Sequence, residues 1–297
     1  MKTRQEIKAL AREALSEEQG TGILLVLVYA LLALGIRLVY ALPTWWMRAA
    51  DIDLGAGIVE AIITFGMIMG SMFLHILFYY AGLLFLYVVV VNLYGEFVKI
   101  YRREPAGAGA LFVELRVNFG RKLGGMLWRG LWIFLWSLLA LLFISNAVFN
   151  ILVWIFFGYY EAAVTFIILS ILTLLPAVVK VLSYSMTPYI LASCPNVKAT
   201  SALTLSRRMM KGHKGKLLML GLSFIGWLFL SVLTLGILYI VHVGPYMHTT
   251  FAGFFDTLRE EAISSGAIRA EELEGSVPVY SAAQQVDAEG DQGTGGL

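Results

Sequence analysis

Apolar runs of roughly 20 residues recur along this 297-residue chain, separated by shorter segments that hold most of the positive charge. A helix of that length crosses the ~30 Å hydrocarbon core of a bilayer. Only 14% of the residues are charged, whereas soluble domains carry about a quarter. We therefore predict an all-α protein, a polytopic transmembrane helical bundle, and not a water-soluble fold.

The charge is distributed unevenly. The chain up to Phe255 has 20 basic and 11 acidic residues, a net charge of +9, whereas from Asp256 onward two basic and nine acidic residues give −7. Basic connectors beside apolar segments are typical of cytoplasmic loops and of surfaces that contact anionic lipid. We expect the lipid bilayer and anionic lipid headgroups as partners, with a membrane protein as the alternative. Because no single soluble face is basic, we expect no nucleic acid.

The first 18 residues place apolar side chains at helical spacing, with charges of both signs between them. The apolar positions are Ile7, Leu10, Ala11, Ala14 and Leu15. This pattern predicts an amphipathic cytoplasmic helix over residues 1–19, lying on the membrane surface. Four acidic residues interrupt the region that would be basic in a signal peptide, so we expect no cleaved leader.

We place the transmembrane bundle at residues 20–262. The predicted spans are 21–42, 77–97, 130–149, 163–181, 217–233 and 237–255, with basic cytoplasmic segments at 98–129 and 193–216. The last two can instead form one tilted span and a surface segment, giving five spans. The acidic, glycine-rich segment 263–297 predicts a disordered tail.

About 50 residues without Lys or Arg separate Arg48 from Lys99, enough for one crossing or two. Two crossings would put Lys99 and the next basic residues on the outer side, against the positive-inside rule. We therefore expect one crossing, preceded by an apolar helix on the outer side.

Residues Ser183–Trp227 contain the densest basic region. Asn196 predicts a helix N-cap and Gly212 a helix stop, so we expect a basic amphipathic interfacial helix over 197–211. The candidate lipid- or partner-binding residues are Arg207, Arg208, Lys211, His213, Lys214 and Lys216. Positive-inside topology alone would account for such a cluster. The alternatives are a specific headgroup, a phosphorylated ligand or a protein partner.

Polar residues inside apolar runs form a second candidate group: Arg37, Glu60, His75 and Asn92. Intramembrane ionisable residues are functional candidates by default. The structural alternatives are an Arg37 side chain that extends to the interface, Glu60 at the outer surface and an Asn92 amide bonded across helices. The four histidines lack metal-ligand spacing and no catalytic motif is present, so we expect no metal, no cofactor and no enzyme.

Several segments carry a resemblance to a known family. They are TRQEIKALAREAL, LPAVVKVLSYSMTPYILASCP, SRRMMKGHKGKLLMLGLSFIGW, LTLGI, Pro245-Tyr246 and FAGFFDTL. In these the chain resembles an uncharacterised bacterial integral-membrane family, catalogued as domain of unknown function 975. The resemblance implies a small polytopic helical bundle with an N-terminal cytoplasmic helix, and it favours six spans. It implies no activity.

We expect first a non-enzymatic accessory or scaffold protein of a bacterial cytoplasmic membrane, multi-pass, with a cytoplasmic N-terminus. The second hypothesis is an oligomeric transporter of a small molecule or lipid, and the third a membrane-embedded enzyme. A transporter predicts a polar cavity near mid-membrane lined by Asn92, His75 or Glu60. A scaffold predicts a filled apolar core, and an enzyme predicts several titratable groups in one interfacial pocket.

Overall fold

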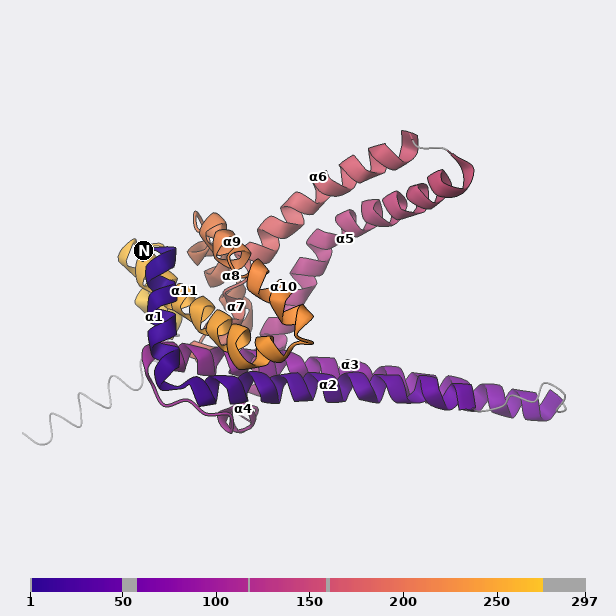
Figure 1. Ribbon diagram of the computed structural model, residues 1–297, viewed down its shortest axis with the longest axis horizontal. Helices are drawn as coiled ribbons and strands as arrows, with labels where there is room; N and C mark the ends of the chain where they lie inside the picture. The colour runs from indigo at the N-terminus through magenta and orange to yellow at the C-terminus, as the bar shows by residue number, and fades with distance from the viewer. Residues whose placement is uncertain (1, 50–57, 117, 159–160, 275–297) are drawn as a thin grey trace, which may run out of the picture. The chain divides into compact units, whose positions relative to one another are not determined.

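The computed structural model describes residues 2–49, 58–116, 118–158 and 161–274. Within these ranges every regular element is a helix (Figure 1). They are α1 (Arg4–Glu17), α2 (Gln19–Ala49), α3 (Ile58–Arg102), α4 (Ala110–Val113), α5 (Phe119–Phe157), α6 (Glu161–Ser183), α7 (Thr187–Ser193), α8 (Ala199–Met209), α9 (Lys214–Leu222), α10 (Ile225–Leu233), η1 (Tyr239–Val243), α11 (Gly244–Ser264) and α12 (Ala270–Glu274). The predicted all-α fold is confirmed.

Five helical segments in the described part of the chain are long and apolar enough to cross a membrane. They are Gln19–Val39, Phe65–Arg102, Phe119–Phe156, Val164–Ser193 and Lys214–Leu233. Large apolar side chains point outward from them; Phe73 and Leu172, for example, are 66% and 61% exposed. Apolar surface this extensive indicates a surface that contacts lipid or another protein. The segments indicate a membrane protein, and their number is the lower of the two that we expected.

The chain divides into two compact units. The first comprises Met1–Arg4, Gly120–Leu222 and Phe254–Leu297, and the second Gln5–Phe119 and Ser223–Gly253. In the first unit, α5 and α6 run in opposite directions (Figure 1). The ring of Phe143 lies 6.5 Å from that of Phe166, and the Lys180 ammonium lies 4.1 Å from the centroid of the Trp136 ring.

In the second unit, α2 and α3 lie side by side (Figure 1). Gly82 brings the two backbones together, because a Cβ at this position would lie 3.0 Å from the Ile36 side chain. Helix α3 is continuous over 45 residues. It thus joins the outer apolar helix and the span 77–97, which we predicted as separate. No proline lies within α3, so no residue of this type interrupts its backbone hydrogen bonds.

The predicted sixth span, 237–255, is divided between the π-helical turn η1 and the start of α11. The division falls at Gly244-Pro245, where the proline begins a new helix without needing an N–H donor. Neither element is among the five apolar segments.

Helix α1 forms where the apolar spacing predicts it. Its buried face consists of Ile7, Ala11, Ala14 and Leu15. Within the second unit, the Lys8 ammonium lies 4.4 Å from the centroid of the Phe224 ring and the Arg12 guanidinium 5.7 Å from that of Tyr246. The apolar face therefore packs against the protein itself, whereas we had expected it to lie on lipid.

The C-terminal segment is ordered further than predicted. Helix α11 continues to Ser264, and α12 covers Ala270–Glu274. Ile268 and Leu273 are each only 1% exposed. Because these two side chains are buried, disorder from residue 263 is wrong for residues 263–274; the rest of the predicted tail lies outside the described residues.

Candidate functional site

Helix α8 is the predicted basic helix of the first unit. It begins at Ala199 after an N-cap at Lys198 that makes no side-chain cap hydrogen bond, so the predicted Asn196 cap is wrong. Helix α8 ends at Met209, two residues before the predicted end. Gly212 lies in the turn that follows, with φ +85°, a left-handed conformation that glycine adopts readily. The buried face consists of Ala202, Leu203, Leu205, Ser206 and Met209, which confirms an amphipathic helix.

Ser206 holds α8 in place. Its hydroxyl donates to the carbonyl of Ser183 at 2.9 Å and accepts from the backbone N–H of Met186 at 3.2 Å. Ser206 is fully buried. The bonds tie α8 to the turn between α6 and α7, and thereby set where the following residues point.

Two arginines of the predicted basic segment 98–129 are internal to the first unit. The Arg121 guanidinium donates to the carbonyls of Leu191, Val197 and Cys194 at 2.6, 3.0 and 3.2 Å. Carbonyls at the end of a helix such as α7 lack intrahelical donors, so this contact satisfies them. Arg129 Nε donates to the carbonyl of Tyr184 at 3.0 Å.

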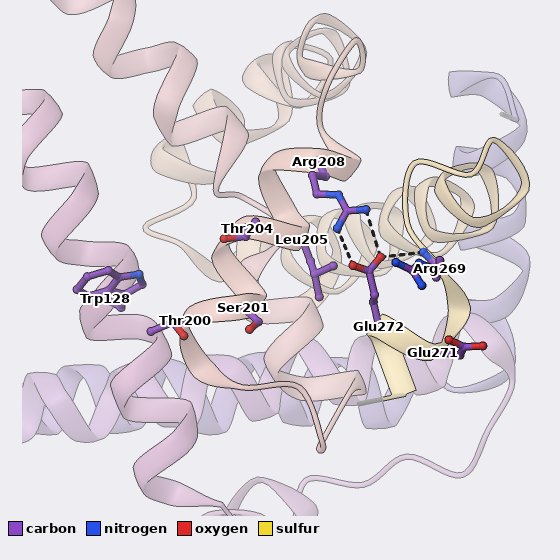
Figure 2. Close-up of a pocket in the computed structure, with 9 residues that line it drawn as sticks. All are labelled: Trp128, Thr200, Ser201, Thr204, Leu205, Arg208, Arg269, Glu271 and Glu272. Atoms are coloured by element: carbon purple, nitrogen blue, oxygen red, sulfur yellow. Dashed lines mark hydrogen bonds and ion pairs between the residues drawn. The ribbon is translucent and has the colours of Figure 1, made fainter. Parts of the chain in front are cut away.

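Arg208 points at the C-terminal segment (Figure 2). Its Nη1 and Nη2 donate to the two carboxylate oxygens of Glu272 at 2.8 and 3.2 Å, while Nε and Nη2 donate to the carbonyl of Ala267 at 3.1 and 2.7 Å. The backbone N–H of Arg269 also donates to Glu272, at 2.9 Å. The hydrogen bond from Arg208 and the one from Arg269 hold the pKa of Glu272 below its usual value. Arg208 therefore anchors α12.

His213 has a C-terminal partner as well. Its Nε2 lies 3.2 Å from a carboxylate oxygen of Glu261. Burial raises the pKa of Glu261, but the hydrogen bond and the charge of His213, with other positive charges, leave the pKa below its usual value. Arg208 and His213 thus both face acidic residues of their own chain.

Arg207, the neighbour of Arg208, lines a different pocket. This pocket has a volume of about 320 Å³, and we name it the tryptophan groove. It is lined by Trp128, Trp132, Trp136, Lys180, Tyr184, Leu203, Thr204 and Arg207. The tryptophans are four residues apart and so share one face of α5; the first two rings meet edge to face at 5.9 Å. We did not predict this groove, although the spacing of the three tryptophans was a readable signal.

A second pocket of about 670 Å³ adjoins the groove, sharing Trp128 and Thr204 with it (Figure 2). Its other lining residues are Thr200, Ser201, Leu205, Arg208, Arg269, Glu271 and Glu272. Two arginines and two glutamates balance its charge.

The three lysines of the candidate cluster lie at the surface. Lys211 and Lys216 are exposed and Lys214 is half-buried, all close to the start of α9. They stand beside the apolar segment Lys214–Leu233, where topology and lipid contact both place positive charge.

In the second unit, Asn92 and Glu96 hold the segment that follows α3. The Asn92 amide donates to the carbonyl of Leu111 at 2.9 Å. Glu96 accepts from the backbone N–H of Gly107 at 2.9 Å and from Lys99 at 2.6 Å. Both Asn92 and Glu96 are fully buried. Asn92 therefore fits the structural alternative, a polar group satisfied by its own chain.

The remaining intramembrane candidates do not form one site with Asn92. Arg37 is exposed on α2, and His75 is half-buried on α3. His75 and Asn92 are separated along the same helix by roughly 25 Å at the usual rise per residue. Glu60 belongs to α3, but its side chain lies outside the described residues.

The comparisons with known proteins add the family. Residues 1–262 match the sequence profile of a family described as "Protein of unknown function (DUF975)". No curated protein and no solved structure matches the chain. The matched range includes every described helix that is apolar enough to cross a membrane. The chain therefore belongs to the DUF975 family.

Proposed function

We propose that this protein is a non-enzymatic accessory or scaffold protein of the bacterial cytoplasmic membrane, with a cytoplasmic N-terminus. Its basic interfacial surface contacts anionic lipid headgroups. One observation carries this proposal: exposed basic side chains, those of Arg207, Lys211 and Lys216, stand where α8 meets an apolar segment long enough to cross a membrane. Each basic residue near an anionic leaflet contributes about 1 kcal/mol of attraction.

The transporter hypothesis is less well supported by the polar residues. A transport site needs polar groups that face a cavity near mid-membrane. Asn92 is bonded to the carbonyl of Leu111. The groove of about 650 Å³ between α2 and α3 has an apolar lining, formed by Val28, Leu31, Leu32, Gly35, Ile36, Val39, Phe78, Ala81, Gly82 and Phe85. We therefore put the accessory role first.

Lipid selectivity tests the proposal. The full chain is reconstituted in mixed phosphatidylcholine and phosphatidylglycerol bilayers, and electron spin resonance measures the fraction of spin-labelled lipid that the protein immobilises. We expect enrichment of phosphatidylglycerol over phosphatidylcholine that weakens in 1 M salt, where the Debye length is about 3 Å. Equal immobilisation of the two lipids at low salt would contradict the proposal.

A pair of matched variants assigns the effect to the basic surface. Replacing Lys211, Lys214 and Lys216 together by Gln should lower the enrichment, whereas replacing them by Arg should preserve it. Crosslinking and pull-down from native membranes distinguish the alternative: a stoichiometric protein partner, with no lipid selectivity, would assign the surface to that partner.

A further inference from the structure

We infer that the tryptophan groove is a discrete binding site for the headgroup of one anionic phospholipid, whose phosphate faces Lys180 and Arg207. This inference rests on the proposed function and deepens it. The proposed function needs only diffuse attraction by exposed lysines. The groove would add a single bound lipid at a defined place in the first unit.

The charge of the groove favours an anion. Two cationic side chains line it, and none of its eight lining residues is acidic. Neither Lys180 nor Arg207 makes an ion pair with a described residue. The Lys180 ammonium rests on the face of Trp136, a contact that orients the charge and leaves N–H donors for another group. A phosphodiester carries one negative charge and two free oxygens, so it can contact both cations at once.

Arg208, in the adjoining pocket, provides a comparison, because its guanidinium is paired with a carboxylate. Arg208 is bonded to both oxygens of Glu272, and Glu271 lines the same pocket. Among the residues that the structure describes, consecutive positions of α8 therefore hold one arginine with a carboxylate partner and one without. Arg207 faces the lining of the groove, where the missing partner is an anion from outside the chain.

The hydrogen-bonding groups of the groove suit a phosphate headgroup. Thr204 adds an exposed hydroxyl, and each tryptophan adds an indole N–H donor. Tryptophan rings prefer the headgroup level of a bilayer. The groove combines these donors with Arg207 of α8 and with Lys180, which belongs to the membrane-spanning candidate Val164–Ser193; the tryptophans belong to the candidate Phe119–Phe156.

The surroundings favour a lipid over a soluble phosphate. Trp128 and Trp136 are each 37% exposed, so the groove is open along α5. Leu135 and Leu139, three residues beyond Trp132 and Trp136, are 49% and 54% exposed. Residues three apart are neighbours on a helix. An apolar surface for acyl chains therefore begins beside the groove, which a soluble phosphate would leave unused.

Native mass spectrometry of the full chain in neutral detergent tests the inference. The probe is phosphatidylglycerol, and the readout is its affinity for the tightest site. We expect one retained lipid in the unaltered protein. Arg207→Gln and Lys180→Gln should each weaken it about fivefold or more, the factor that one basic residue contributes near an anionic surface. Arg207→Lys should retain binding, and this guards against a loss caused by misfolding.

Lys211→Gln is the matched control. It removes one positive charge four residues after Arg207, at a position that does not line the groove. If Lys211→Gln lowers the tightest affinity as much as Arg207→Gln does, the attraction is diffuse and the discrete site is wrong. The proposed function would still stand, provided that phosphatidylglycerol is enriched over phosphatidylcholine in the bilayer experiment. Loss of that enrichment would contradict both the discrete site and the proposed function.

Three further ligands identify the chemistry. Diacylglycerol lacks the phosphate and should not be retained, and phosphatidylcholine should bind more weakly than phosphatidylglycerol. Glycerol phosphate at millimolar concentration should not displace the lipid; displacement would assign the groove to a soluble phosphate and overturn the lipid assignment. A photoreactive residue in place of Thr204 that crosslinks a protein and no lipid in native membranes would also overturn it.

Discussion

The guanidinium of Arg208 donates to both carboxylate oxygens of Glu272, a residue 64 positions further along the chain. The neighbouring Arg207 lines the tryptophan groove, where none of the lining residues is acidic. A charge cluster that looks uniform in sequence is thus divided between an internal anchor and a surface that can meet an external anion.

Removing the anchor should release α12. With Arg208→Gln, both the bidentate contact and the bonds to the carbonyl of Ala267 are lost, so residues 267–274 should exchange amide hydrogens faster. The cost to global stability should be small, about 1 kcal/mol or less, because the pair is partly exposed. Hydrogen exchange with mass spectrometry measures this, with Arg207→Gln as the control. Unchanged exchange in Arg208→Gln would show that other contacts hold the segment.

Acid should have the same effect on α12. The pKa of Glu272 is held below its usual value, by the hydrogen bond from Arg208 first and by the Arg269 N–H second. The folded state therefore binds this proton less readily than the unfolded state does. The stabilisation is complete above the ordinary pKa of about 4.5 and is lost as the pH falls through the lower folded value.

The pH effect is measured as the difference in thermal midpoint between the unaltered protein and Glu272→Gln. This difference should shrink as the pH falls from 5 to 3. A difference that stays constant over this range would show that the Glu272 charge has no part in holding α12.

Glu96→Ala should be more costly than any change to the surface lysines. The Glu96 side chain is 1% exposed and accepts from both Lys99 and the Gly107 N–H. Its removal leaves both donors without this acceptor, and this should lower the free energy of unfolding by about 2 kcal/mol. Chemical unfolding in detergent measures the loss. Glu114→Ala is the control, because Glu114 also pairs with Lys99 but is 29% exposed; equal losses would argue against burial as the cause.

Gly253→Ala should destabilise the second unit. A Cβ at this position would overlap the Tyr101 ring, lying 2.7 Å from its Cζ, and overpacking of this kind costs about 1–3 kcal/mol. Gly226→Ala is the matched control, since nothing lies within 4 Å of its Cβ position. We expect the thermal midpoint of Gly253→Ala to be lower than that of the unaltered protein, and that of Gly226→Ala to be unchanged. Equal midpoints would mean that the ring moves aside without cost.

The features that follow from local pattern could be read from the sequence. Apolar runs predicted the helices that can cross a membrane, and the spacing of Ile7, Ala11 and Leu15 predicted α1. The glycine at position 212 predicted the turn between α8 and α9. Glu96 and Lys99, three residues apart and so neighbours on one helix, form an ion pair at 2.6 Å.

Features that depend on distant partners could not be read in this way. The pairing of Arg208 with Glu272 and of His213 with Glu261 joins segments 64 and 48 residues apart. Asn196 was a good cap by residue type, yet α8 begins three residues later. Val197, just before that start, is 2% exposed, and Ser206 bonds to Ser183 at the end of α6; local propensity contains neither contact.

The tryptophan groove lies between these cases. The spacing of Trp128, Trp132 and Trp136 was visible, but Lys180 and Arg207 reach it from two other helices. Without their placement, the stripe is indistinguishable from an ordinary interfacial belt.

The most direct test of the account is the side of the membrane on which the basic surface lies. With Cys194 replaced by Ser and Lys211 replaced by Cys, a membrane-impermeant maleimide is applied to intact cells and to permeabilised cells. The account predicts labelling at position 211 only after permeabilisation. Labelling in intact cells would put the basic surface outside and contradict it.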